Sequence, residues 1–394
     1  MHHIKTKLIS KTQAKWIFTA LACAYSLLSF PVSSAIYFNA KVGGPVTNIY
    51  AIEQQGKLTK LTQNRVWRDL QPSVSKLGEL VFMSNRQAEV KVDLNQTSEV
   101  FNIYHLDPKS NRITPLTNNM SQDVNPQFSP DGHKLAFIRF IDKKKVLYIM
   151  DLESNTELEV LRAEDIFGYS WANTQEVLAI AIKQGDHSQL LSLKLDGLTK
   201  KPLLQTRRSA DKDDISSTVN NLSNLNSYRD QSEIMTPVWS TDDSQIAFIF
   251  HPTKRGEMRQ LALYPIDTGV VKLVSPANIS VQSPVQWSKD NHSLLYSGLQ
   301  DYRYYYDEQT QRKTYLGSMQ IFMSKLTGST VQLTQGDHLH RNPVFSPDGR
   351  NIAYLYADEL GGARHLSLRT MALDGSHSKQ IFDRVARQSS LLWR

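Results

Sequence analysis

The sequence has a single cysteine, Cys23, among its 394 residues. Cys23 lies in a segment expected to be a leader, so the mature chain has no thiol. Disulfides, cysteine nucleophiles and thiolate metal sites are therefore excluded. The G-x-S-x-G elbow of serine hydrolases and the H-E-x-x-H signature of zinc peptidases are also absent from the sequence. Neither of these two peptidase classes fits the chain.

The N-terminal segment lacks an apolar run long enough to span a membrane. Its run from Trp16 to Phe30 has 15 residues, whereas a membrane-spanning helix needs about 20. This run follows four lysines and precedes Ser33-Ser34-Ala35, a small-x-small cleavage pattern. We therefore predict that residues 1–35 are a cleavable signal peptide, that the mature chain begins near Ile36, and that the protein is periplasmic.

Two other fates of this segment are open alternatives. One is an uncleaved membrane anchor. The other is a lipoprotein modified at Cys23, although Ala20 stands where lipoproteins usually have a leucine, three residues before the cysteine.

A large excess of charge of one sign is absent as well. The formal net charge of +7 becomes +3 once the four lysines of the leader are removed, and the basic residues are scattered. No nucleic-acid-binding motif is present, so nucleic acid is not an expected partner. We expect a globular monomer with no stable membrane span after signal removal.

What recurs in the sequence is an octet that ends in S-P-D-G. Asn342 to Gly349 reads N-P-V-F-S-P-D-G, Asn125 to Gly132 reads N-P-Q-F-S-P-D-G, and an apolar run follows each. The alternation favours a short strand, and S-P-D-G supplies the fixed φ, the Asx-type hydrogen bond and the positive φ of a tight reversal. Each octet therefore predicts a β-hairpin. Looser copies begin at Gln71, Tyr169, Thr236 and Ser283.

The aromatic residues that close each first strand are spaced by 43, 68, 48, 58 and 48 residues; they are Phe128, Trp171, Trp239, Trp287, Phe345 and Trp393. Periods of about 40 to 50 residues are typical of propeller blades, and longer gaps indicate loop insertions. A second hairpin follows the first, as at Leu147 to Leu161. Each repeat therefore has four strands, which is one blade.

The two ends of the chain match different parts of one repeat. Residues 36–61 match strands two to four of a blade, and Gln388 to Arg394 match a first strand. We therefore predict an all-β, seven-bladed β-propeller over residues 36–394, closed by the C-terminal strand, which completes the N-terminal blade. A six-bladed ring, with Gly168 to Thr206 miscounted, is the alternative. The seven first strands are at Pro72, Pro126, Trp171, Pro237, Pro284, Pro343 and Trp393.

The repeat P-x-[F/W]-S-P-D-G-x-x-[I/L]-A-[F/Y], with V-F-M-S-N-R at Val81 to Arg86 and N-I-Y-H-L-D at Asn102 to Asp107, resembles the propeller of the periplasmic TolB family. The resemblance covers nearly all of 36–394 and implies a propeller of the bacterial cell envelope. TolB proteins carry an additional N-terminal domain before a six-bladed propeller, and no such domain is expected here. Such blades also occur in peptidases, lyases and sensors, so the resemblance implies a fold more than an activity.

Three insertions interrupt the blades, and insertions on a scaffold are where specificity is expected. Gln87 to Val100 is polar, and Arg207 to Glu233 is rich in Asp, Ser and Asn. A calcium site is not favoured in the second insertion, because Asp211 to Asp214 lacks the alternating ligands and glycine of a known calcium loop.

The third insertion combines tyrosines with basic residues, a composition typical of recognition surfaces. We predict a partner-binding hairpin formed by Tyr302, Arg303, Tyr304, Tyr305, Tyr306 and Tyr315. The alternative is that the tyrosines only cover the side of their own blade.

Another group of polar and charged residues precedes the first strands, where propeller geometry gathers loops at the mouth of the axial channel. The predicted channel-mouth ligand residues are Asp69, Asp123, His338, His340 and Arg341. They could bind a metal or a small polar solute. The alternative is that they only hydrogen-bond strand ends and channel water. The metal question stays open, and no cofactor is predicted.

These features favour a binding or scaffolding module for an envelope protein or glycan, with no catalytic residue assigned. The alternative is an enzyme at the channel mouth, such as a polysaccharide lyase. The chain resembles the seven-bladed oligogalacturonate lyases in blade count and repeat style. Those enzymes use a cluster of histidines for a metal, whereas in the expected mature chain only His338 and His340 lie close together.

Overall fold

The computed structural model describes residues 34–53, 56–86, 100–107, 110–207, 232–253, 256–309, 311–361 and 363–394. The expected signal peptide up to Ser33, including Cys23, lies outside the described residues. So do most of the first two insertions, 87–99 and 208–231, with the candidate calcium residues. Among the residues described, no helix is long and apolar enough to cross a membrane.

Four separate antiparallel sheets have four strands each. They are β4 Asp69–Val74, β5 Leu80–Ser84, β6 Asn102–Leu106, β7 Ile113–Pro115; β8 Asp123–Phe128, β9 Lys134–Ile141, β10 Lys144–Asp151, β11 Thr156–Ala163; β12 Asp165–Trp171, β13 Val177–Gln184, β14 His187–Lys194, β15 Thr199–Arg207; and β16 Ser232–Trp239, β17 Gln245–Pro252, β18 Gln260–Pro265, β19 Lys272–Leu273. The only helical turn in the described chain is a short 3-10 turn, Asp196–Leu198. The prediction of an all-β fold built from four-stranded repeats is therefore confirmed.

The other strands fall into three similar groups that make a 12-stranded sheet. They are β20 Ser280–Trp287, β21 Ser293–Asp307, β22 Arg312–Lys325, β23 Thr330–Gln332; β24 Leu339–Phe345, β25 Asn351–Ala357, β26 Leu366–Ala372, β27 Lys379–Val385; and β1 Ala35–Gly43, β2 Val46–Glu53, β3 Leu58–Lys60 with β28 Leu392–Trp393. Only one residue pair, Met319 with Leu339, joins the first group to the second. Another single pair, Ala40 with Val385, joins the second to the third.

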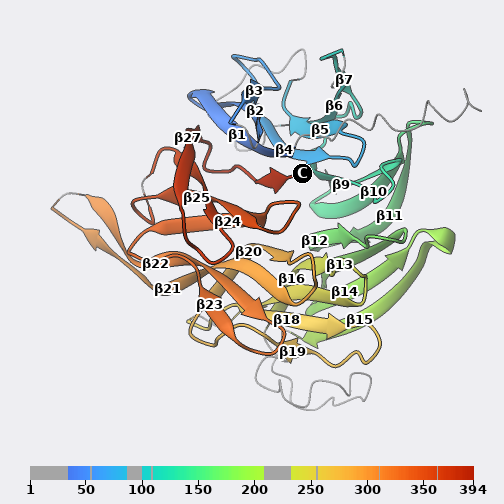
Figure 1. Ribbon diagram of the computed structural model, residues 1–394. Coiled ribbons are helices and arrows are strands. Elements are labelled where there is room, and N and C mark those ends of the chain that lie inside the picture. Colours follow the sequence, from blue (N-terminus) through green and yellow to red (C-terminus); the bar gives the residue numbers. More distant parts are fainter. Residues whose placement is uncertain are drawn as a thin grey trace, which may run out of the picture. The chain divides into compact units, whose positions relative to one another are not determined.

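The last strand lies beside the first. β28 pairs with β1 through Ile36 with Trp393 and Tyr37 with Leu392, and it also contacts β24. The Nε1 of Trp393 donates to the Oγ of Ser34 at 2.9 Å. Figure 1 shows the C-terminal end among the strands that begin the sheets.

The S-P-D-G turns join first and second strands as the octets predict. The hydroxyl of Ser129 donates to Asp131 at 2.5 Å and accepts the Lys134 N–H at 2.9 Å. Gly132 has φ +85°, a conformation that glycine adopts at little cost. The turn between β24 and β25 has the same hydrogen bond, because the hydroxyl of Ser346 donates to the Asp348 carboxylate at 2.5 Å.

The turn between β12 and β13 lacks this aspartate in its own sequence. Asp243 of the following sheet replaces it, since its carboxylate accepts the backbone N–H groups of Asn173 at 2.6 Å and Thr174 at 2.9 Å. These hydrogen bonds hold the pKa of Asp243 below its usual value, although burial alone would raise it. The segment that left the blade count open therefore forms a complete four-stranded sheet.

A proline interrupts most first strands next to a bulge. The residue before the proline has positive φ in four repeats, at Gln71, Asn125, Thr236 and Asn342, and the pairing register shifts at each of these points. Proline cannot donate a ladder hydrogen bond, so it is tolerated at an edge strand or a bulge. Each first strand is the edge strand of its group, apart from the single pair that joins β24 to β22.

The core lies between neighbouring sheets. Second strands are apolar in a continuous run and buried on both faces, as in β5, whose five residues are all buried. In one cluster Leu147 and Ile149 pack with Trp171, Leu178 and Ile180 from the next sheet. Burial on both faces explains why these strands do not alternate with polar residues.

Candidate functional site

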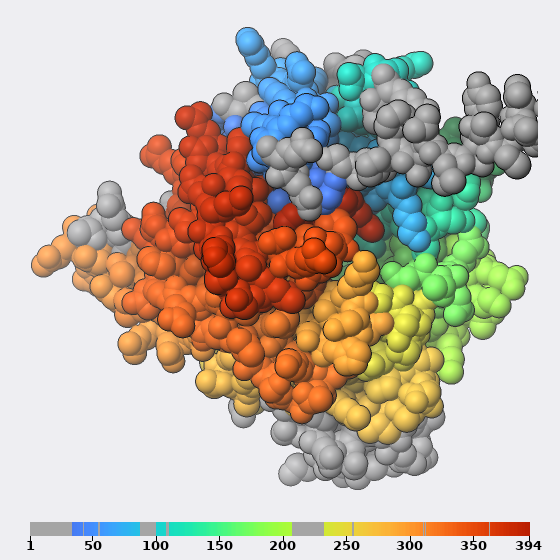
Figure 2. Space-filling model, in the orientation of Figure 1, coloured from blue at the N-terminus to red at the C-terminus, as the bar shows by residue number. Residues whose placement is uncertain are grey.

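The β21–β22 hairpin is longer than the corresponding hairpins of the other groups. Its strands have 15 and 14 residues, whereas β5 and β6 have five each. The pairing continues past the register shift at Gln300 to Arg303 as far as Asp307 with Arg312. The hairpin projects from the left edge of the view in Figure 2.

Four of the predicted tyrosines are exposed on this hairpin, with exposed fractions of 46% for Tyr302, 53% for Tyr304, 52% for Tyr305 and 57% for Tyr306. The Nζ of Lys313 lies 4.1 Å from the centre of the Tyr304 ring, which is a cation–π distance. Arg303 is exposed as well. Aromatic and basic side chains are therefore available to a partner at the end of the hairpin.

The fifth tyrosine is placed differently. Tyr315 pairs with Tyr304 in the register, is partly buried, and its ring lies 6.3 Å from the Tyr302 ring. A Cβ added at Gly361 would meet the Tyr315 ring at 2.2 Å, so the ring lies directly against the Gly361 backbone. Tyr315 thus attaches the hairpin to the connection between β25 and β26.

The two predicted histidines lie beside the same connection. Their rings are 6.2 Å apart, and both are near Tyr356, at 5.5 Å for His338 and 5.2 Å for His340. The Nδ1 of His338 is 3.1 Å from the carbonyl oxygen of Asp358, and the Nδ1 of His340 is 3.3 Å from that of Met319 in β22. The structure therefore brings the histidine pair and the tyrosine hairpin into one region.

His340 is buried, and burial lowers its pKa to about 4, with His338 and Arg369 adding repulsion. It is therefore neutral at pH 7. Burial and the charge of Arg387 lower the pKa of Arg341, whose Nε donates to the Oδ1 of Asn342 at 3.3 Å.

A recess of about 410 Å³ lies along the same connection. Its charged lining has both signs, and Tyr356 gives it an aromatic wall. The guanidinium of Arg369 is 3.8 Å from the centre of the Tyr356 ring. The lining includes Asp358, Glu359, Arg364, His365, Arg369 and Asp383.

The two predicted aspartates, Asp69 and Asp123, are buried and hydrogen-bonded by other side chains. Asp69 is fully buried and accepts hydrogen bonds from Asn64 at 2.8 Å, Ser84 at 2.7 Å and Arg86 at 2.5 Å. The Arg86 guanidinium is 5.2 Å from the centre of the Phe82 ring. Side chains that precede and follow Asp69 in the sequence therefore bind its carboxylate.

Asp123 repeats this arrangement in the next sheet. It is fully buried and receives two hydrogen bonds from Arg139, at 2.7 and 2.8 Å, and one from Asn119 at 2.8 Å. Burial alone would lower the pKa of Arg139, but hydrogen bonds to Asp123 and Glu157 raise it. Within the described ranges no three His, Cys, Asp or Glu side chains could hold one metal ion.

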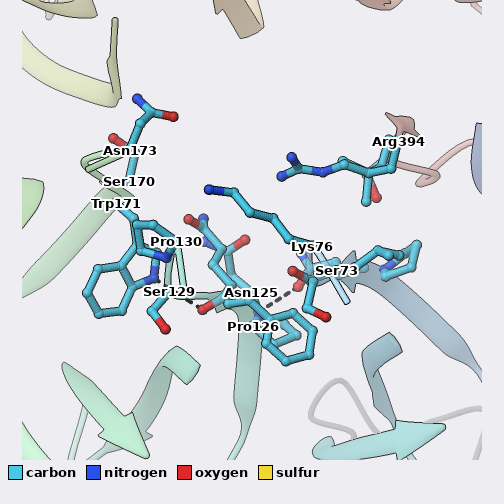
Figure 3. Close-up of a pocket in the computed structure, with 18 of the residues that line it drawn as sticks. Ser73, Lys76, Asn125, Pro126, Ser129, Pro130, Ser170, Trp171, Asn173 and Arg394 are labelled. Carbon is cyan, nitrogen blue, oxygen red and sulfur yellow. Dashed lines mark hydrogen bonds between the residues drawn. The ribbon is translucent and has the colours of Figure 1, made fainter. Parts of the chain in front are cut away.

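One cavity was missed by sequence reasoning. It has a volume of about 400 Å³ and lies at the C-terminal ends of β4, β8 and β12, opposite the residues that begin these strands. Figure 3 shows Lys76, Asn125, Trp171, Asn173 and Arg394 around it. The only sequence signal was that these positions follow the bulge of each first strand, and that signal names no ligand.

The comparisons with known proteins agree on the fold. No protein-family model matches the chain. A stretch of 77 residues is 27% identical to the Tol-Pal system protein TolB of Hahella chejuensis, covering 20% of this chain and 18% of that protein.

Among solved structures, an oligogalacturonate lyase in complex with manganese has a TM-score of 0.56 at 13% identity, covering 85% of each chain. TolB from Acinetobacter baumannii has a TM-score of 0.48 at 14% identity, covering 90% of this chain and 82% of that one. Likeness to the lyase, at this identity, shows the fold alone. The fold is a TolB-like β-propeller.

Proposed function

We propose that the protein is an exported, periplasmic β-propeller that binds a protein or glycan partner in the bacterial cell envelope. The recognition surface is the β21–β22 hairpin together with the adjoining recess. One observation carries this proposal: four tyrosines that are about half exposed stand beside Lys313 and Arg303 on one hairpin. Tyrosine and arginine are the residues that most often dominate binding energy at interfaces.

The hairpin is suited to binding because it is held in place before a partner arrives. Tyr315 rests on Gly361, and the backbone N–H of Met319, at the base of the hairpin, donates a hydrogen bond to the His338 carbonyl oxygen at 3.0 Å. A surface that is already ordered loses less conformational entropy on association.

We also propose that the propeller is a monomeric ring of seven blades closed by the C-terminal strand. The pairing of β28 with β1 supports this closure. The seven groups of strands, each beginning with an edge strand, support the count. Cleavage after Ala35 would remove the two hydrogen bonds between Ala35 and Arg394 but would keep the Ile36–Trp393 pair.

The test is partner capture by the purified protein from envelope extract, followed by cross-linking that maps the contact. A variant with Tyr302, Tyr304, Tyr305 and Tyr306 all changed to serine should lose capture while its melting temperature stays near that of the parent. The matched control changes Leu77 and Met120 to serine, because these exposed apolar residues lie elsewhere. Capture that survives the tyrosine changes would overturn the assignment, and stoichiometric bound metal would favour an enzyme.

A further inference from the structure

The cavity at the C-terminal ends of β4, β8 and β12 has a charge that the proposed function does not explain. Its lining contains two cationic side chains, Lys76 and Arg394, and no aspartate or glutamate side chain. Within the described residues, neither cationic group has a side-chain ion pair. In Figure 3 both extend toward the space above Asn125. An anion in this space would meet two cationic side chains and no acidic side chain.

The wall of the cavity also contains unsatisfied hydroxyls. The Oγ atoms of Ser170 and Ser390 are buried and have no hydrogen-bond partner in the part of the chain that the structure describes. Both residues line the cavity. Neither oxygen is exposed to the cavity as the side chains stand, so a ligand would reach these hydroxyls only after a rotation about χ1, which would give each unpaired group a partner.

Part of the remaining lining is apolar and fixed in position. Pro126 and Trp171 lie on it, and the Trp171 indole N–H donates to the Gln127 carbonyl oxygen at 3.2 Å. Arg394 is held in place by β28, the strand directly before it, which pairs with Ile36 and Tyr37 of β1. Because arginine stays charged at any physiological pH, the positive charge is a permanent part of the site.

We infer that this cavity binds a small organic dianion of the dicarboxylate type, with its carboxylates between Lys76 and Arg394 and its carbon chain against Pro126 and Trp171. Two cations approaching from different elements match two separated carboxylates better than one compact ion. A volume of about 400 Å³ lies within the range of small-molecule sites. The site is independent of the tyrosine hairpin.

The experiment is titration calorimetry of the purified protein at low ionic strength with succinate and citrate, and with inorganic phosphate as the compact anion. We expect the dicarboxylate and citrate to bind and to raise the melting temperature. Lys76→Gln and Arg394→Gln should each weaken binding about tenfold or more, because each removes one charge-assisted contact. Lys272→Gln, at an exposed lysine on β19, is the matched control and should bind as the parent does.

Several results would overturn the inference. These are no binding of succinate or citrate at millimolar concentration, binding that Lys76→Gln does not weaken, or phosphate binding as tightly as either. Lys76 is exposed, so its variant carries the test even if Arg394→Gln is too unstable to purify. The tyrosine-to-serine variant should keep anion binding, which separates this site from the proposed partner surface.

Discussion

The backbone N–H of Asn39 donates a hydrogen bond to the Oγ of Ser389 at 2.8 Å, across 350 positions in the chain. Ser389 is 1% exposed, and its carbonyl oxygen accepts the side-chain N–H of Asn342 at 2.9 Å. One serine therefore connects β1, β24 and the C-terminal segment. These contacts cannot form until the two ends of the chain have come together.

Replacing Ser389 with alanine should lower the free energy of unfolding by about 1 to 3 kcal/mol, because the buried Asn39 N–H loses its acceptor. The neighbouring Ser390→Ala is the control, since the Ser390 hydroxyl has no partner among the described residues. Denaturant unfolding would compare the two. Equal stability of the two variants would show that the Ser389 hydroxyl does not stabilise the junction of the ends.

Removing the last strand should be far more harmful than a surface change. A chain ending at Gln388 loses the pairing of β28 with β1 and exposes a strand edge, so we expect aggregation or rapid proteolysis. Trp393→Ala should cost about 2 to 4 kcal/mol, somewhat below the loss for a fully buried tryptophan, because Trp393 is only partly buried. If the truncated chain melts within a degree or two of the intact one, the proposed closure is wrong.

Asp123→Asn should destabilise the protein by about 3 kcal/mol, since it leaves Arg139 without its buried partner while Glu157 remains. Asp186→Asn, at an exposed aspartate, is the control and should be neutral. Thermal unfolding measures both. A stable Asp123→Asn variant that lost ligand binding instead would show that this carboxylate faces a ligand, as the sequence-based prediction allowed.

His340 should make stability fall with acidity. Its folded-state pKa of about 4 lies below the ordinary value of 6.5, so the unfolded chain takes up a proton first. The neutral His340 therefore contributes roughly 3 kcal/mol to the free energy of unfolding. This contribution is complete above about pH 6.5 and is lost as the pH falls toward 4. His340→Gln should show a shallower loss of stability over this window, whereas His292→Gln, at an exposed site, should follow the parent. Parallel pH profiles for parent and His340→Gln would contradict the burial argument.

Gly317→Ala should disrupt the base of the tyrosine hairpin. Gly317 has φ +93°, and a Cβ there would lie 2.5 Å from the Gln300 carbonyl oxygen, a clash with backbone that cannot be relieved cheaply. We expect faster proteolytic cleavage within 300–317 while the rest of the chain stays folded. Gly328→Ala is the control, because it also has positive φ but meets nothing within 4 Å. Equal cleavage of the two variants would show that the hairpin tolerates the clash.

Features that depend on neighbouring residues could be predicted from the sequence alone. The S-P-D-G reversals were predictable because Ser129 bonds residues at most five positions away. The apolar second strands were equally local, and each end of the chain could be matched to its own part of a repeat from its own residues. A tight turn and a buried strand each leave a pattern that one short segment contains in full.

The contacts between side chains that are distant in the sequence became visible only in the folded chain. Folding placed Tyr315 against Gly361, which leaves Tyr315 partly buried while the other four tyrosines are exposed, and it supplied Asp243 to a turn in another sheet. It also placed Lys76 and Arg394 on one cavity, 318 positions apart in the chain. No local pattern encodes such meetings, because they follow from the packing of whole sheets against one another.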